Sequence, residues 1–264
     1  MAKFNSAFKF TGSLGDVSGV KRHDSPETYL RLKAGPTRDM VKNGSNFART
    51  RENNSQFSGC SSTVKEIRRS LTDLLDVSDS RVTNRLMKIC SALQKADINN
   101  ARGQRAILFS KFGMWLNDFE LNLHTALNSV IKISNSTVVK LTSSAQIVIP
   151  TLIPGLNFSN PWKQPKYRIM ATLSTVPDMV YRETGYAPEN VSGEFELKRA
   201  SFFTEFLGSN LVYPGSTINL QLNNFTPNAS TNLLLAVGVQ FGNDQPVGTV
   251  PAKRAACGKI LAIV

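Results

Sequence analysis

The sequence predicts an α+β protein: an N-terminal β-hairpin and a basic helical hairpin, followed by a C-terminal antiparallel β-sandwich that is jelly-roll-like. Two observations lead to this class. Apolar residues recur at helical spacing from about residue 63 to 93, and short β-rich runs separated by Pro, Gly and Asn recur after residue 136. We therefore expect three parts: a hairpin with an irregular arm (1–59), a helical region (60–133) and a sandwich domain (134–264).

The N-terminal part begins with a pattern typical of a β-hairpin or short meander. Phe4, Phe8 and Phe10 interleave with polar residues, residues 12–16 supply turn chemistry, and short strands are expected at 17–22 and 29–32. A hairpin of this size is marginal alone, so we expect it to pack on another surface. The following stretch, 34–59, has little hydrophobic periodicity, which predicts an irregular arm. A loop that long is usually functional or a linker.

Two amphipathic helices are predicted next. Thr63 and Glu66 have capping-box spacing, and the second helix is expected to begin near Ser78 or Asp79. One apolar face is expected on each helix, made by Val64, Ile67, Leu71, Leu74 and Leu75, and by Val82, Leu86, Ile89, Cys90 and Leu93. The short joint at 76–79 indicates an antiparallel hairpin. From 106 to 133 the pattern favours helix before Trp115 and fits either helix or strand after it.

Seven β-rich runs follow, and with the turn signals between them they predict the sandwich. They are 137–141, 146–153, 166–175, 191–198, 217–222, 232–241 and 257–263. Residues 217–222 alternate, as a half-buried strand does, whereas 233–237 are apolar throughout. The second pattern predicts a central strand covered on both faces.

Bulk properties set the class of protein. The chain has 264 residues, of which 41% are hydrophobic and 19% charged, as in a folded globular protein. No apolar run approaches the length of a membrane span, and the N-terminus lacks the apolar stretch of a classical signal peptide. The three cysteines, Cys60, Cys90 and Cys257, match neither a zinc site nor a disulfide framework. We expect them to be buried thiols in a protein that is cytoplasmic as synthesised, with later release or export left open.

The positive charge lies in the first half of the chain. The net charge is +12, and residues 1–115 hold 20 Lys and Arg against 10 Asp and Glu, a net of +10. Residues 116–264 hold 11 against 9, a net of +2. This asymmetry favours nucleic acid or an acidic protein surface as a partner, and it is also compatible with an ordinary solvated face.

Catalytic patterns are missing from the sequence. It contains no GxSxG, P-loop or GxGxxG motif, and neither His23 nor His124 lies in a metal-ligand spacing. Glu194 and Glu196 would share one face of a strand, where solvent exposure is commoner than acid–base chemistry. We expect no catalytic residue, no metal, no cofactor and no small-molecule substrate, so the chain is not predicted to be an enzyme.

One segment resembles a known group. Residues 35–38 and 47–57, which include Phe47, the run RTREN at 49–53 and the pair Gln56-Phe57, are similar to uncharacterised hypothetical proteins of the Bacteroidetes. In that group a phenylalanine, RTREN and a following EF or QF recur ahead of a basic helix. The resemblance covers about 25 residues and implies a compact bacterial protein. It implies no activity, cofactor or site residue.

The function expected from these observations is structural: a homo-oligomer, filament or shell that assembles through the N-terminal arm and the sandwich edges. The candidate interface residues are Phe4, Phe8, Phe10, Arg38, Phe47, Arg49, Arg51 and Phe57. The alternative is a coat-like protein that binds nucleic acid through Lys65, Arg68, Arg69, Arg81, Arg85 and Lys88. A second alternative is a carbohydrate- or surface-binding sandwich with Trp162, Tyr181 and Tyr186 as stacking residues. Arg49 and Arg51 have a structural interpretation too, as donors to nearby carboxylates or backbone carbonyls.

Overall fold

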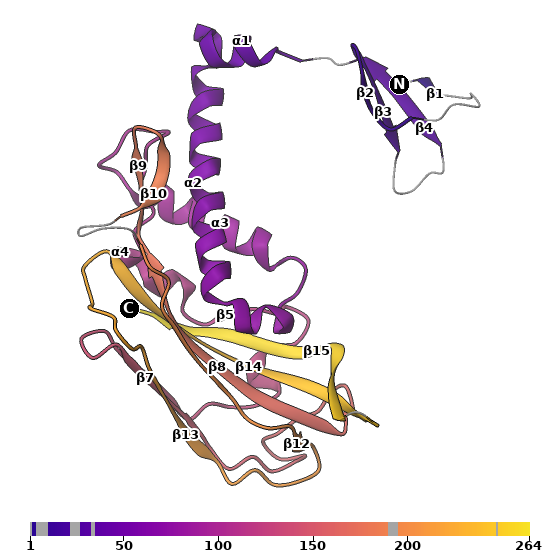
Figure 1. Cartoon of the computed structure of the whole chain (residues 1–264), viewed down its shortest axis with the longest axis vertical. Coiled ribbons are helices and arrows are strands. Elements are labelled where there is room, and N and C mark those ends of the chain that lie inside the picture. The colour runs from indigo at the N-terminus through magenta and orange to yellow at the C-terminus, as the bar shows by residue number, and fades with distance from the viewer. Residues whose placement is uncertain (1, 4–9, 22–26, 33–34, 190–194, 247) are drawn as a thin grey trace. The chain divides into compact units, whose positions relative to one another are not determined.

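The structure is a computed structural model that describes residues 2–3, 10–21, 27–32, 35–189, 195–246 and 248–264. The chain forms two compact units, Met1–Arg51 and Glu52–Val264. The expected helical region and sandwich both fall in the second unit, which contains three layers: helices, a six-stranded sheet and a three-stranded sheet (Figure 1).

The N-terminal unit contains a four-stranded antiparallel sheet with the order β1-β4-β3-β2. Its strands are β1 (Ala2–Lys3), β2 (Gly12–Leu14), β3 (Val17–Lys21) and β4 (Thr28–Leu32). The predicted N-terminal hairpin is confirmed as β2–β3, joined at Gly15, whose φ of 54° suits the tight turn. Of the three phenylalanines expected in a first strand, Phe4 and Phe8 lie outside the described residues, and Phe10 precedes β2.

The stretch predicted to be an irregular arm is largely helical, so that prediction was wrong. It contains α1 (Arg38–Asn43), the 3₁₀ turn η1 (Ser45–Phe47) and the first half of α2 (Ala48–Ser70). Thr37 caps α1, because its hydroxyl accepts a hydrogen bond from the Met40 amide at 3.3 Å. The first half of α2 displays no apolar stripe, since most of its side chains are polar and exposed or half-buried. Hydrophobic periodicity therefore missed it.

The start predicted for the first long helix is corrected as well. Thr63 is not an N-cap residue, because α2 begins 15 positions earlier, at Ala48. Thr63 is fully buried in the middle of α2, where its hydroxyl donates a hydrogen bond to the Gly59 carbonyl at 2.9 Å. Thr63 and Glu66 therefore have capping-box spacing without forming a capping box, and Glu66 pairs with Arg69 instead.

The antiparallel helical hairpin is formed by α2 and α3 (Val82–Ala96), joined through the 3₁₀ turn η2 (Thr72–Val77). Cys60 near the middle of α2 contacts Gln94 near the end of α3, whereas Arg68 near the end of α2 contacts Thr83 near the start of α3. The two helices therefore run antiparallel. The predicted apolar faces are confirmed as buried for Val64, Ile67, Leu71, Leu74, Val82, Leu86, Cys90 and Leu93, whereas Leu75 and Ile89 are half-buried.

The segment that the sequence left open changes character close to Trp115. It forms the short helix α4 (Phe109–Phe112) and the 3₁₀ turn η3 (Gly113–Leu116), then the strand β5 (Phe119–Glu120) and a last 3₁₀ turn, η4 (Leu127–Ser129). The helical preference before Trp115 is confirmed. The alternation after it belongs to a short edge strand that pairs with β15.

The antiparallel sandwich is confirmed. Its larger sheet has the order β11-β8-β14-β15-β5 with β12 also paired to β8, and its smaller sheet has the order β13-β7-β6. A separate hairpin, β9–β10, was not predicted. The strands after β5 are β6 (Asn135–Val139), β7 (Ser144–Ile149), β8 (Lys166–Pro177), β9 (Met179–Arg182), β10 (Gly185–Pro188), β11 (Arg199–Phe203), β12 (Leu207–Gly208), β13 (Ser216–Gln221), β14 (Thr231–Gln245) and β15 (Gly248–Ile263).

The strand expected at 191–198 is not observed at that position, and the nearest strand in the structure begins at Arg199. Residues 190–194 lie outside the described part of the chain, 195–198 are not in a strand, and β11 begins at Arg199. The half-buried strand expected at 217–222 is confirmed, since β13 buries only alternate residues, among them Ile218 and Leu220.

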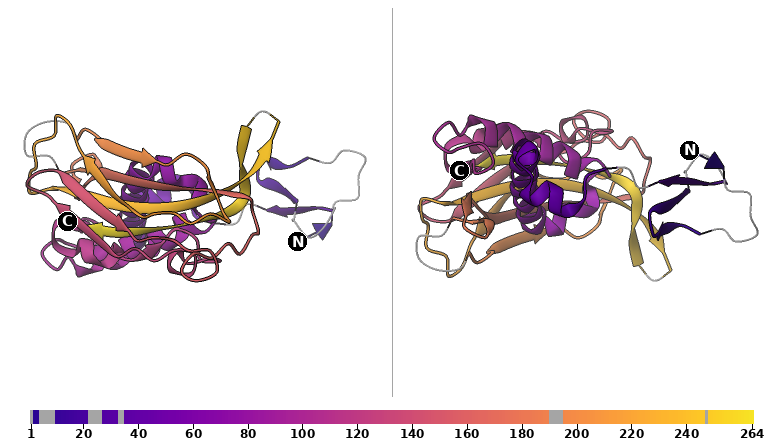
Figure 2. Two further views of the ribbon diagram at one scale, coloured as in Figure 1. Left: turned by 90° about the horizontal axis from the view of Figure 1, so that it is seen from below. Right: turned by 90° about the horizontal axis from the view of Figure 1, so that it is seen from above.

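The centre of the larger sheet is covered on both faces, as the apolar run at 233–237 predicted. On β14, Leu233, Leu235 and Val237 face the sandwich core, whereas Leu234 and Ala236 face the core formed with the helices. The two remaining views of the ribbon agree with this layering of the second unit (Figure 2). No helix among the described residues is long and apolar enough to cross a membrane.

Candidate functional site

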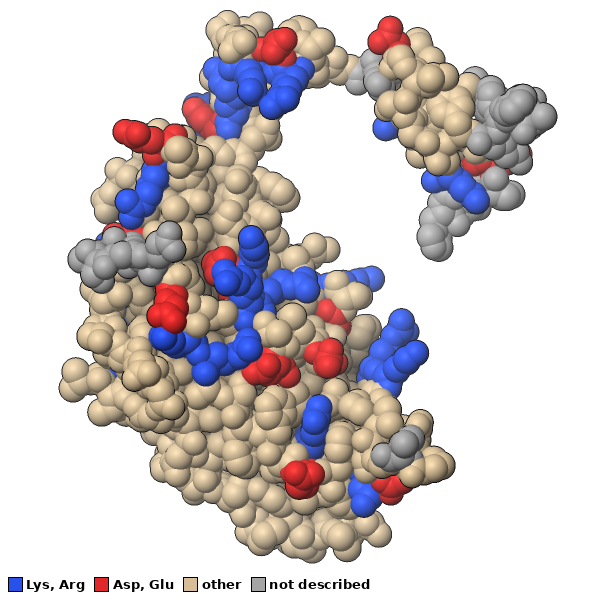
Figure 3. Space-filling view, in the orientation of Figure 1, with Lys and Arg blue, Asp and Glu red and all other residues tan. Residues whose placement is uncertain are grey.

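Basic side chains gather on one face of the second unit, over the C-terminal half of α2 and its neighbours, with acidic side chains interspersed among them (Figure 3). A groove of about 440 Å³ lies within this region. Val64, Leu75 and Met87 form its apolar part, while Lys65, Arg68 and Arg69 supply the positive charge. Three of the six residues predicted to meet nucleic acid therefore lie together.

The spacing of α2 explains this groove. Val64 and Arg68 are four positions apart, as are Lys65 and Arg69, so these two pairs form neighbouring rows along one side of the helix. The apolar members lie toward α3 and the basic members at the rim, where Lys65, Arg68 and Arg69 are exposed. A rim of this kind can hold anions or an acidic surface.

Several of the basic side chains already have partners. Arg69 forms an ion pair with Glu66 at 2.9 Å, and Arg68 donates a hydrogen bond to the Thr83 hydroxyl. In the part of the chain that the structure describes, Lys65 and Arg68 make no ion pair with a carboxylate. Of the three groove cations, these two are therefore the more available to a partner.

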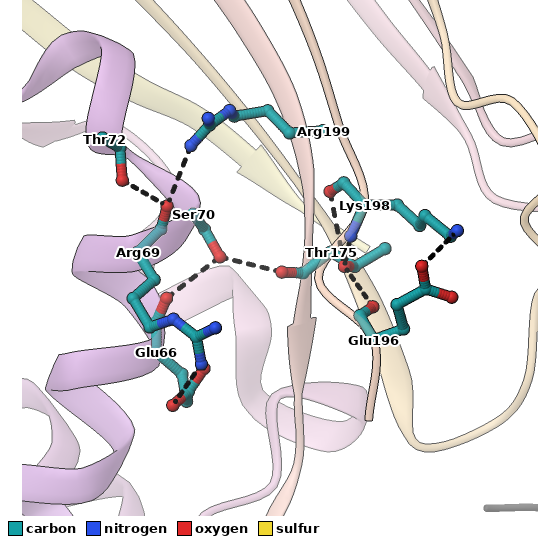
Figure 4. Close-up of polar contacts among 8 residues, drawn as sticks. All are labelled: Glu66, Arg69, Ser70, Thr72, Thr175, Glu196, Lys198 and Arg199. Atoms are coloured by element: carbon teal, nitrogen blue, oxygen red, sulfur yellow. Dashed lines mark hydrogen bonds and ion pairs between the residues drawn. The ribbon is translucent and has the colours of Figure 1, made fainter. Parts of the chain in front are cut away.

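The end of α2 is tied to the edge of the larger sheet by residues that the sequence analysis did not select. The Arg199 guanidinium donates to the Arg69 carbonyl at 3.2 Å and pairs with Asp73 at 3.0 Å. The Ser70 hydroxyl lies 2.8 Å from the Thr175 carbonyl, and Lys198 pairs with Glu196 at 2.6 Å (Figure 4). A cation at a helix C-terminus satisfies exposed carbonyls and the helix dipole. No sequence signal joins residues some 130 positions apart.

The other residues predicted to meet nucleic acid do not join this groove. Arg85 is a structural residue: it pairs with Asp79 at 2.8 Å, donates to the Leu121 carbonyl at 2.9 Å and lies over the Phe119 ring. Lys88 is exposed beside a second, mostly apolar groove of about 570 Å³ that Trp115 also lines. Arg81 is exposed at the N-cap of α3. The expected basic set therefore does not form one continuous surface.

The predicted interface residues in the N-terminal unit have mixed roles. Arg51 donates hydrogen bonds to the Val41 and Gly44 carbonyls at 3.0 and 2.8 Å, which supports its structural interpretation. Phe47 is half-buried in η1, while Arg38 and Arg49 are exposed. In the second unit, Phe57 is 66% exposed on α2, a large apolar side chain in water.

The described part of the N-terminal unit buries few residues. Across its described residues (2–3, 10–21, 27–32 and 35–51), those with a burial assigned include only two that are buried, Gly19 and Thr28. Leu14 and Leu32 are 69% and 73% exposed. The two outer strands of its sheet, β1 and β2, each pair with one neighbour only. The unit thus combines open edges with exposed apolar side chains.

The potential metal ligands and the thiols of the described residues are dispersed or buried. The described residues contain no group of three or more His, Cys, Asp or Glu side chains able to hold a metal ion. All three cysteines are free and buried, as expected, and burial raises the pKa of the Cys60 thiol to about 11 and that of Cys257 to about 12. Glu196 is paired with Lys198, and Glu194 lies outside the described residues.

The stacking residues suggested for a carbohydrate-binding module do not cluster. Tyr181 and Tyr186 pair edge to face with ring centroids 5.4 Å apart, and the Tyr186 hydroxyl donates to the Arg105 carbonyl at 2.9 Å. Tyr186 is therefore part of the scaffold. Trp162 lies elsewhere, packed against Phe241.

Comparison with known proteins identifies no relative. No protein-family model matches the chain, and neither a curated protein nor a solved structure matches it.

Proposed function

We propose that this protein is a non-catalytic structural subunit that assembles with further copies of itself through its N-terminal unit. The observation that supports this most directly is how little the described part of the unit buries: among its residues with a burial assigned, Gly19 and Thr28 alone are buried. A sheet of four short strands needs an apolar face against another surface to be stable. A neighbouring copy supplies such a surface.

Strand edges support the same proposal. β1 and β2 end the N-terminal sheet, and β11 and β5 end the larger sheet of the sandwich. Edge strands carry unpaired backbone groups that can pair with another chain. On β11, Phe202 and Phe203 are 36% and 44% exposed, which adds apolar contact area to that edge.

Deleting residues 1–51 tests the proposal. Full-length protein is expected to be oligomeric by light scattering or sedimentation, whereas residues 52–264, which hold the buried core, are expected to be folded and monomeric. A truncated chain that keeps the full-length mass, or a full-length chain that is monomeric at all concentrations, contradicts the proposal.

Two point variants sharpen this experiment. Leu32→Lys places a charge on the exposed apolar surface of the N-terminal unit and is expected to weaken association. Leu141→Lys is the matched control, because Leu141 is 86% exposed in the second unit while Leu32 is 73% exposed. The control variant is expected to keep the full-length mass.

Nucleic-acid binding is the second candidate. It is favoured by the groove in which Lys65, Arg68 and Arg69 lie together, with two of the three free of carboxylate partners among the described residues. It ranks second because Glu66, Asp73 and Glu196 lie among the basic side chains and reduce the local positive charge.

A further inference from the structure

A polar pocket of about 430 Å³ lies where four separate segments of the second unit meet. The segments are the joint between η2 and α3, the loop that follows β5, the loop that carries Trp162, and β15 at Arg254. Its volume falls within the usual range for small-molecule sites, about 300–1,000 Å³. Neither assembly nor nucleic-acid binding involves this pocket.

The floor of the pocket is held by a closed set of hydrogen bonds. Asp79 receives the Leu123 amide at 2.9 Å and the Arg85 guanidinium at 2.8 Å. Asn122 donates to the Ala256 carbonyl at 2.8 Å and accepts from the His124 amide at 2.9 Å. These bonds hold the backbone at Leu123, His124 and Ala256, next to the rim of the pocket.

The rim, by contrast, is made of polar side chains that lack partners. Within the described part of the chain, no hydrogen bond or ion pair engages the side chains of Asp76, Ser80, His124, Thr125 or Arg254. Arg254 also adopts a φ of 60°, an uncommon conformation for a non-glycine residue. Unpaired donors and acceptors from distant segments thus converge on one cavity beside the half-buried indole of Trp162.

We propose that this pocket binds a neutral saccharide of one or two sugar units. A carboxylate, a guanidinium, two hydroxyls and an imidazole match the many hydroxyl groups of a sugar, and an indole packs on its apolar C–H face. The formal charges of Asp76, Asp79, Arg85 and Arg254 sum to zero, and Arg85 is already paired with Asp79. A phosphorylated ligand is disfavoured because Asp76 would repel it and one arginine alone faces it.

Intrinsic fluorescence tests this site directly, because the chain has two tryptophans. In Trp115→Phe, Trp162 is the only reporter. We expect titration with glucose, galactose, N-acetylglucosamine, maltose or cellobiose to change its emission in a saturable way for at least one sugar. Sorbitol at the same concentration controls for solvent effects, and adenosine monophosphate tests the phosphorylated alternative.

The contribution of the rim is measured with a second variant in the Trp115→Phe background. Asp76→Ala is expected to weaken saccharide binding about tenfold, the loss of one charge-assisted hydrogen bond. Glu183→Ala is the matched control, since Glu183 is exposed in the β9–β10 turn, away from the pocket, and this variant is expected to bind as before. Asp76 is exposed too, so thermal melting is expected to show both variants folded.

Three results would overturn the proposal. The first is no saturable response to any of the five sugars. The second is tighter binding of adenosine monophosphate than of every sugar. The third is an equal loss of binding in Asp76→Ala and Glu183→Ala.

Discussion

At the scale of single residues, the arginines show why the net charge of the chain overstates how many cations are available to bind a partner. Arg51, Arg85 and Arg199 each donate to backbone carbonyls, and Arg85 and Arg199 also pair with aspartates. Guanidinium groups suit this role because they present several donors in a fixed plane. The charge count can be read from the sequence, but these backbone acceptors cannot: the carbonyls that Arg85 and Arg199 contact lie 36 and 130 positions away.

The buried face of α2 gives a residue-scale prediction. Leu71 is 1% exposed in the core shared with α3 and the larger sheet, so Leu71→Ala is expected to lower the free energy of unfolding by about 2–5 kcal/mol. Leu141→Ala removes the same atoms from an 86% exposed side chain and is expected to change it by less than about 0.5 kcal/mol. Equal effects of the two substitutions in chemical denaturation would contradict the assigned core.

At the scale of elements, the sequence predicted those that bury a regular apolar pattern. The apolar faces of α2 and α3, the alternation of β13 and the continuous apolar run of β14 were all recognisable because burial itself imposes the period. The first half of α2 escaped because it buries little and because part of its support is polar and long-range, from Arg102 and Gly103 to Glu52, Asn53 and Ser55. β9 and β10 escaped because their strands are short and only half-buried.

The ends of α3 make an element-scale prediction about pH. Burial disfavours the Asp79 carboxylate, but hydrogen bonds from the Leu123 and Arg81 amides and the charge of Arg85 outweigh it and lower the pKa of Asp79. Burial acts likewise on Asp97 at the other end of α3, where hydrogen bonds from Asn100, Ala106 and Asn99 lower its pKa. A lowered pKa in the folded state stabilises the protein above the unfolded value of about 3.9.

That stabilisation is expected to be lost as the pH falls from about 5 through the lowered pKa values. Asp79→Asn is expected to cost about 1–3 kcal/mol at pH 7 and to show a smaller further loss of stability at pH 3 than the unmodified protein. Urea unfolding at both pH values measures this, and Glu183→Gln serves as the exposed control. Identical pH dependence in Asp79→Asn and the unmodified chain would show that Asp79 does not supply the effect.

At the scale of the whole molecule, the sequence predicted a sandwich but not its place in the second unit. The larger sheet is the middle layer, and its two faces build two separate cores. Gly238 and Gly258 leave room for Val77 of η2 against that sheet, which brings the helical hairpin onto it. Val77 lies more than 150 positions from either glycine in the sequence. No local sequence pattern therefore predicts that the helical hairpin packs here. The polar pocket has the same long-range origin, because its lining comes from residues as far apart as Asp76 and Ala256.

The charge of the whole chain gives the last prediction, which separates assembly from nucleic-acid binding. Of the groove cations, only Lys65 and Arg68 lack a carboxylate partner among the described residues, so residues 52–264 are expected to neutralise about two phosphates. The slope of log affinity against log salt for a single-stranded oligonucleotide is then about −1.4, and purified full-length protein is expected to have the absorbance ratio of protein alone. The double variant Lys65→Ser/Arg68→Ser is expected to flatten that slope. The control is Lys95→Ser/Lys111→Ser, because both lysines are exposed and neither lines the groove, and it is expected to leave the slope unchanged. A slope steeper than about −4, or protection of a defined oligonucleotide length from nuclease, would make nucleic acid the primary partner.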